Sequence, residues 1–149
     1  MKRDFASVVT GMPVLREKPP IYDEASKLFN LKQGDTTFFT FGPCIYNPDG
    51  VNMPNDLRVH EEVHGHQQEH DEVVAKLWWK RYMEDPKFRY EQELEAYGVQ
   101  YQYLASRIRD RNQLARALHT ISGMLSSPMY GSLVTQGEAA KALRAYVQK

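Results

Sequence analysis

The hydrophobic residues of this chain follow two different periods. From about residue 56 onward, apolar side chains recur every three or four positions, as in Leu94, Tyr97 and Tyr101, which is the spacing of an amphipathic helix. Capping signals interrupt this pattern, among them Asp85-Pro86 and the capping box Thr135–Glu138. Together these signals predict helices over about residues 22–31, 56–68, 73–83, 86–109, 112–125 and 135–147.

The strongest strand signal is the β-branched and aromatic segment that begins at Thr36. It continues through Gly42-Pro43 and stops at the turn residues Asn47–Gly50, which predicts a strand over about residues 36–46. Because proline has no N–H to donate, Pro43 places this strand at a sheet edge or at a bulge. An extended peptide could add to such an edge as a further strand, and the alternative is an edge that faces water.

We therefore expect one α+β domain over residues 1–149 that is mostly helical. The strand would pack on the helix over residues 56–68, and three or four further helices would follow. The first 20 residues end in Lys18-Pro19-Pro20 and are predicted to form an extended lead-in. A chain of 149 residues can bury a core of this kind.

Charge and cysteine content narrow the classes of function. The chain has 19 basic and 19 acidic residues, so no overall field favours nucleic acid or an anionic membrane. We expect neither a signal peptide nor a membrane span, because no apolar run of the necessary length is present. The single cysteine, Cys44, excludes an intrachain disulfide and is predicted to act as a small buried hydrophobe. These features favour a cytoplasmic protein.

One segment carries a specific chemical signal, His-Glu-x-x-His at His60, Glu61 and His64. On a helix, residues four positions apart lie about 40° apart on one face. Two neutral imidazoles at that spacing can share one tetrahedral zinc ion. Glu61 lies next to the first histidine and can reach a water molecule at the metal rather than the metal itself. The alternative without a metal site is a solvated helix that is rich in histidine and glutamate.

The same predicted helix has two further features. His66 and His70 repeat the four-residue spacing but point away from the first pair and lack the adjacent glutamate, so we expect surface groups or groups behind the ligands. Gly65 in mid-helix costs about 1 kcal/mol relative to alanine. Close approach of another backbone, or of a substrate, would account for it.

A catalytic zinc site needs a third protein ligand and an open position for water. The candidates on a separate rigid element are His119 and a carboxylate of the segment Glu91-Gln92-Glu93-Leu94-Glu95. At helical spacing, Glu91 and Glu95 each lie about 160° from Glu93, so Glu93 cannot face the histidines together with either of them.

The pattern His60-Glu61-x-x-His64, followed after a helix by Glu93-x-Glu95-Ala96-Tyr97, resembles the gluzincin branch of zinc metallopeptidases, in particular the small single-domain forms of bacteria and phages. The resemblance covers roughly Thr36 to Tyr103. It implies a minimal zincin-like domain with Glu93 as the third zinc ligand. Larger gluzincins have an aspartate four residues after that glutamate, which orients a zinc histidine. Here Tyr97 takes its place and carries no charge to raise imidazole basicity.

The activity implied is zinc-dependent hydrolysis of peptide bonds in a peptide or protein substrate. Glu61 would act as general base toward water and then pass the proton to the departing amine. A further donor is needed for the oxyanion, and the candidates are Tyr97, Tyr101, His119 and Tyr130. The sequence indicates neither the cleavage specificity nor the oligomeric state.

Two hypotheses from other classes also fit the sequence. In the first, His60, His64 and Glu93 hold a zinc ion without turnover, as a structural site or the relic of an enzyme. In the second, the chain is a metal-free helical interaction module whose histidines are surface groups. Metal analysis separates the second hypothesis from the others, and replacement of Glu61 separates an enzyme from a structural site.

Overall fold

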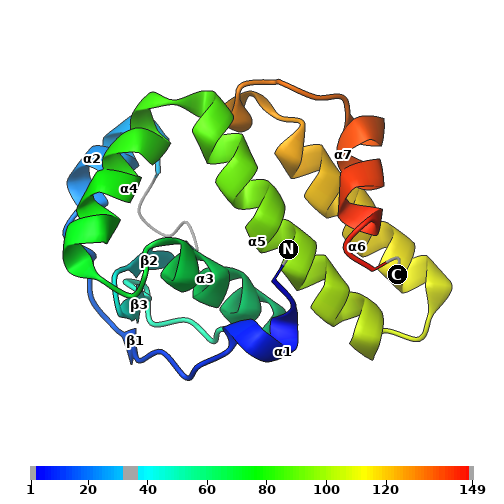
Figure 1. The fold of residues 1–149 in the computed structure, drawn as a ribbon, viewed down its shortest axis with the longest axis horizontal. Helices are drawn as coiled ribbons and strands as arrows, with labels where there is room; N and C mark the ends of the chain where they lie inside the picture. The colour runs from blue at the N-terminus through cyan, green and yellow to red at the C-terminus, as the bar shows by residue number, and fades with distance from the viewer. Residues whose placement is uncertain (1–2, 32–36, 148–149) are drawn as a thin grey trace.

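A long helix, α5 (Pro86–Arg107), divides the molecule into two parts (Figure 1). On one side lie a small sheet and the helices α1 to α4, and on the other side lie α6 and α7. The computed structural model describes residues 3–31 and 37–147. Within these ranges the fold is α+β and mostly helical, with seven α-helices and a three-stranded sheet, which confirms the predicted fold class.

Helices α2 to α7 agree with the six that the periodicity of the sequence predicts to within a few residues, whereas α1 was not predicted. Four of them follow the helix that carries the histidine motif, as expected. Their bounds are α1 Phe5–Val8, α2 Tyr22–Leu28, α3 Asn55–Gln67, α4 Glu72–Glu84, α6 Arg111–Leu125 and α7 Gln136–Arg144, with a short 3₁₀ helix η1 at Pro128–Tyr130.

Capping side chains set most of these boundaries. Asp85 accepts hydrogen bonds from the backbone N–H groups of Lys87 and Phe88, with Pro86 in the first turn of α5. The capping box of Thr135 and Glu138 in front of α7 is also confirmed. Asp110 caps α6, and α2 begins after Ile21 without a side-chain cap, with Asp23 in its first turn.

The predicted strand over residues 36–46 is instead a hairpin of two strands, β2 (Phe39–Phe41) and β3 (Cys44–Tyr46). Thr36 lies outside the described residues. Gly42 has a φ of 62° and forms the turn together with Pro43, so the proline is at the turn and not within a strand. The sheet order is β1-β3-β2, so β3 is central and β2 is an edge.

The lead-in over residues 1–20 is not simply extended, because it contains α1 and the strand β1 (Val14–Leu15). β1 pairs in parallel with β3, where the N–H of Ile45 donates to Pro13 O. A buried carboxylate on α3 also fixes this segment. Glu62 accepts hydrogen bonds from both N and Oγ1 of Thr10, at 2.8 and 2.9 Å. Both contacts join residues far apart in the sequence, so local propensity does not report them.

The outer edge of β2 is partly covered by side chains. Ile45 uses its N–H toward β1, so Thr40 opposite turns its carbonyl to the outer side of the hairpin. That carbonyl accepts hydrogen bonds from Gln68 Nε2 at 3.0 Å and Trp79 Nε1 at 2.8 Å. An added peptide strand would find this acceptor already paired, which argues against strand addition at Thr40.

Three clusters of buried apolar residues hold these elements together. The sheet, α2 and α4 share the first cluster, which includes Phe39, Trp78 and Tyr82. The second joins α5, α6 and α7, and the third joins α1, α3 and α5. None of the helices within the described ranges combines the length and the apolar content that a membrane crossing requires.

Candidate metal centre

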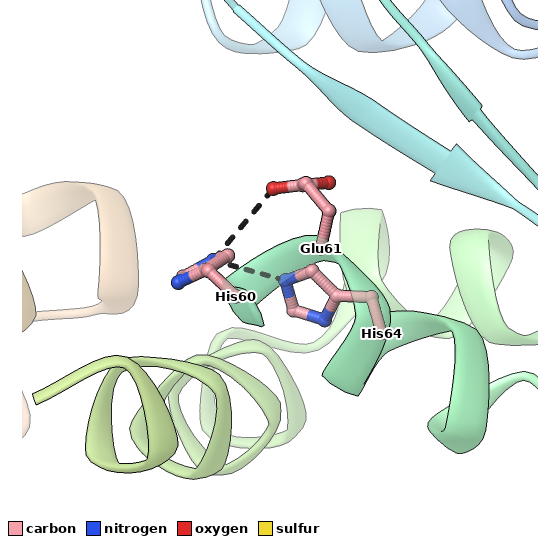
Figure 2. A group of neighbouring side chains, drawn as sticks. All are labelled: His60, Glu61 and His64. Atoms are coloured by element: carbon pink, nitrogen blue, oxygen red, sulfur yellow. Dashed lines mark hydrogen bonds and ion pairs between the residues drawn. The ribbon is translucent and has the colours of Figure 1, made fainter. Parts of the chain in front are cut away.

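Helix α3 presents His60, Glu61 and His64 toward one buried point (Figure 2). All three side chains are buried, with relative exposures of 5 to 8%. Helical spacing puts the two imidazoles on one face, and their rings lie edge to face with centroids 4.9 Å apart. Their ligand atoms, with that of Glu61, lie within 4.8 Å of one another, so this group could hold a metal ion.

Glu93, on α5, brings a carboxylate oxygen into the space between the two imidazoles. Its Oε1 lies 3.0 Å from His60 Nε2 and 3.2 Å from His64 Nε2. The two Nε2 atoms are themselves 3.2 Å apart. Three buried atoms with lone pairs therefore form a nearly equilateral triangle. Glu61 Oε2 is farther away, at 3.9 Å from His60 Nε2, so Glu61 borders the triangle and Glu93 completes it.

The electrostatics of this triangle favour a positive charge at its centre. Burial alone would lower the pKa of His64, but the adjacent Glu93 carboxylate outweighs burial and raises that pKa to about 9. Burial likewise opposes ionisation of Glu93, yet the imidazoles of His64 and His60 hold its pKa well below the usual range. Both shifts have the same cause, since the converging lone pairs attract a proton or another cation.

The second oxygen of Glu93 and the carboxyl of Glu61 each have a hydroxyl partner. Tyr82, buried on α4, donates its hydroxyl to Glu93 Oε2. Thr40 on β2 donates to Glu61 Oε1 at 3.0 Å. Burial raises the pKa of Glu61 above its ordinary value, with the two imidazoles opposing the shift. The two carboxyl groups therefore differ, because Glu93 is held ionised and Glu61 takes up a proton more readily.

The far side of each imidazole contacts a glutamine. His60 Nδ1 lies 2.9 Å from Gln100 Oε1, and His64 Nδ1 lies 2.8 Å from Gln67 Oε1. These contacts leave the two Nε2 atoms to face Glu93. Trp78 packs against the ring of His64, with ring centroids 5.3 Å apart.

Of the four residues considered as oxyanion donors, two lie at the site. Tyr97 packs its ring against His60, with centroids 4.3 Å apart. Tyr97 and Tyr130 both line the cavity beside the site that is described below. Tyr101, also on α5, is instead buried in the second apolar cluster. His119 is exposed on α6, where its carbonyl accepts a hydrogen bond from Gln136.

The other sequence candidates lie outside the triangle. Glu95 pairs with Arg3 at 2.6 Å, and Glu91 is exposed. The rings of His66 and His70 lie 4.7 Å apart, and His66 Nε2 is 2.9 Å from Val8 O. Cys44 is half-buried at the start of β3.

The sequence analysis assigned no role at the site to four residues that lie there, namely Tyr82, Gln67, Gln100 and Thr40. Spacing could have found two of them. Gln67 follows His64 by three positions, and Gln100 follows Glu93 by seven, so each shares a helix face with a site residue. Thr40 and Tyr82 belong to other elements and carry no local signal.

A cavity of about 350 Å³ opens onto this triangle. His60, Glu61, His64 and Glu93 all contribute to its wall. The rest of the wall is mainly apolar and includes Phe29, Phe38, Leu57, Trp78, Met124 and Met129. A small polar cluster in an apolar cavity is the usual composition of a ligand site.

No family model, no curated protein and no solved structure matches this chain in comparisons with known proteins.

Proposed function

We propose that the protein is a zinc-dependent peptidase in which His60, His64 and Glu93 hold the metal ion. The observation that carries this proposal is the triangle of His60 Nε2, His64 Nε2 and Glu93 Oε1, with sides of 3.0 to 3.2 Å. Tetrahedral zinc bonded at 2.0–2.1 Å requires ligand atoms about 3.3 Å apart. The residues present therefore fit the ion in both ligand type and spacing.

The ligand set favours a catalytic site over a structural one. Two histidines and one glutamate are a ligand set of catalytic zinc, whereas structural zinc is closed by four protein ligands, commonly including cysteine. The single cysteine, Cys44, is on β3 and not among the site residues. Three ligands leave a fourth position, and the triangle borders a cavity that can admit a substrate.

The bound ion would supply Lewis acidity toward the scissile carbonyl and toward a water molecule. Glu61 would take one proton from that water molecule as the water oxygen forms a bond to the carbonyl carbon. Glu61 would then deliver the proton to the amine nitrogen as the carbon–nitrogen bond breaks. Burial raises the pKa of Glu61, which suits a group that must both accept and release a proton.

The tyrosines in the cavity would assist as hydrogen-bond donors. Burial, followed by the Glu93 charge, raises the pKa of both Tyr97 and Tyr130, so their hydroxyls keep their protons at neutral pH. A protonated phenol can donate to the oxygen that gains negative charge during attack. The apolar wall supports a substrate with large hydrophobic side chains beside the scissile bond, since they would be buried there.

The test compares the wild type with Glu61→Gln, both purified without a histidine tag. We expect one equivalent of zinc in each protein by elemental analysis. The wild type should cleave a generic peptide pool beside large apolar residues, as read by mass spectrometry. Glu61→Gln should lower the rate by about 10²- to 10⁴-fold.

Two further variants control for loss of the metal. His64→Ala should lose zinc and activity together, whereas His119→Ala removes an exposed imidazole outside the site and should change neither. Wild-type protein that holds zinc without cleaving any peptide would support a structural ion instead. Stable protein without zinc would support the metal-free interaction module.

A further inference from the structure

The glutamine behind His60 has a second partner that fixes its orientation. Gln100 is buried, with 4% exposure, and its Oε1 lies 2.9 Å from His60 Nδ1. Its Nε2 donates to Asp56 Oδ2 at 2.9 Å. His60, Gln100 and Asp56 thus form a continuous hydrogen-bonded chain that links α3 to α5 and returns to α3.

The glutamine behind His64 repeats this arrangement with different residues. Gln67 Oε1 lies 2.8 Å from His64 Nδ1, and Gln67 Nε2 donates to Glu95 Oε1 at 2.9 Å. The same amide nitrogen also donates to the backbone carbonyl of Gln92 at 3.0 Å. Glu95 in turn pairs with Arg3 from the N-terminal segment, at 2.6 Å.

The carboxylates at the ends of these chains determine where the imidazole protons lie. A glutamine amide can turn either its oxygen or its nitrogen toward a histidine, but an ionised carboxylate only accepts hydrogen bonds. Asp56 and Glu95 therefore require the nitrogen of each glutamine, which leaves the oxygen for the imidazole. The Nδ1 of each histidine must then carry a proton, which leaves Nε2 as the nitrogen that can bind a metal ion.

We propose that Asp56–Gln100 and Glu95–Gln67 are two positioning relays that fix His60 and His64 in the tautomer that binds metal through Nε2. The inference rests on the metal centre proposed above. Both histidines need this tautomer at once, because their Nε2 atoms and Glu93 Oε1 converge on one point. Each relay fixes this tautomer with a neutral glutamine amide at the imidazole and a carboxylate that is hydrogen-bonded to that amide.

These relays also explain how the site can work with Tyr97 at the position where larger gluzincins have an aspartate. Tyr97 packs its ring against His60 and leaves Nδ1 to Gln100, which lies three residues farther along α5. The role expected of one aspartate is thus divided between Gln100 and Asp56.

Zinc affinity and imidazole proton resonances test the relays. We expect two slowly exchanging Nδ1–H resonances in ¹⁵N-resolved NMR spectra of the zinc-loaded wild type. Gln100→Ala should lose that of His60, and Gln67→Ala that of His64. Each variant should bind zinc about 10- to 100-fold more weakly in competition with a chromophoric chelator.

A charge swap separates positioning from simple packing. Asp56→Asn alone replaces a carboxylate that only accepts by an amide that can also donate, so Gln100 is no longer forced to turn its oxygen toward His60 and zinc binding should weaken. Adding Gln100→Glu to Asp56→Asn restores a donor–acceptor pair in reverse order, with an acceptor still facing His60 Nδ1. This double variant should recover zinc affinity and the His60 resonance.

The matched control is Gln102→Ala, on the same helix. Gln102 accepts from Phe5 N at 2.9 Å and donates to Tyr146 O at 3.0 Å, so its role is structural. Its loss should lower thermal stability without changing zinc affinity or either resonance. Wild-type zinc affinity that persists in Gln100→Ala and Gln67→Ala would overturn the relays while leaving the metal centre intact. A wild type that binds no zinc would overturn the metal centre and the relays together.

Discussion

At the scale of single residues, the site depends on a carboxylate that is buried and still ionised. Glu93 is 6% exposed, and burying a charge of this kind is costly unless partners compensate. Its Oε1 faces two imidazoles and its Oε2 accepts from Tyr82. The hydroxyl of Tyr82, on α4, therefore positions the proposed metal ligand Glu93 through this hydrogen bond.

Tyr82→Phe tests that role while keeping the aromatic ring that stacks on Trp78 at 4.8 Å. The variant leaves Glu93 Oε2 without its donor, so we expect zinc to bind about 10-fold more weakly, measured by chelator competition. Tyr90→Phe removes a hydroxyl from α5 outside the cavity and should leave the affinity unchanged. Equal affinities in both variants would contradict a positioning role for Tyr82.

At the scale of elements, the packing around α3 explains its central glycine. A Cβ on Gly65 would lie 2.5 Å from Met12 Sδ, so the N-terminal segment approaches this helix more closely than an alanine allows. The predicted close approach is therefore made by a side chain, that of Met12, which is 4% exposed. Close contact with the lead-in replaces the substrate or backbone contact that the glycine suggested.

Gly65→Ala should consequently destabilise the fold despite its better helix propensity. The propensity gain is about 1 kcal/mol, and forcing Met12 from its position costs about 1–3 kcal/mol. We expect a net loss of about 1 kcal/mol in the free energy of urea unfolding. Gly137→Ala on α7, where a Cβ meets nothing closer than 4.0 Å, should be neutral or stabilising.

A double-mutant cycle with Met12→Ala identifies the contact. Met12→Ala alone leaves a cavity, which the added methyl of Gly65→Ala partly fills, so the double variant should lose less than the sum of the two single losses. Additive losses would show that the glycine is required for another reason.

At the scale of the whole molecule, the proposed ion would join α3 and α5, two helices that also share the third apolar cluster. α3 supplies His60 and His64, and α5 supplies Glu93, which follows His64 after the whole of α4. Folding is needed to bring these ligands together, so binding to the native state alone should stabilise that state.

Removal of zinc should therefore lower the melting temperature. At free zinc 100-fold above the dissociation constant, the native state gains about 2.7 kcal/mol. For a chain of 149 residues this corresponds to a shift of about 5–10 °C, measured by calorimetry with zinc and with a chelator. His64→Ala should show no zinc-dependent shift. An identical shift in that variant would place the bound zinc elsewhere on the chain.

The sequence by itself determined what local rules can encode. The helices from α3 to α7 follow from apolar spacing of three and four residues, and the cap at Asp85 and the box at Thr135 set two of their starts. The spacing of His60, Glu61 and His64 likewise put three chemical groups on one turn of helix, because helix geometry is fixed by the backbone.

Only the tertiary structure decided which distant groups join them. Thr40 and Tyr82 reach the site from β2 and α4, and β1 forms because β3 lies beside it. These contacts depend on how the elements pack against one another, and no local pattern in the sequence records them. The proposed tautomer of each imidazole also depends on tertiary packing, since it is fixed by a carboxylate that lies two hydrogen bonds from the ring.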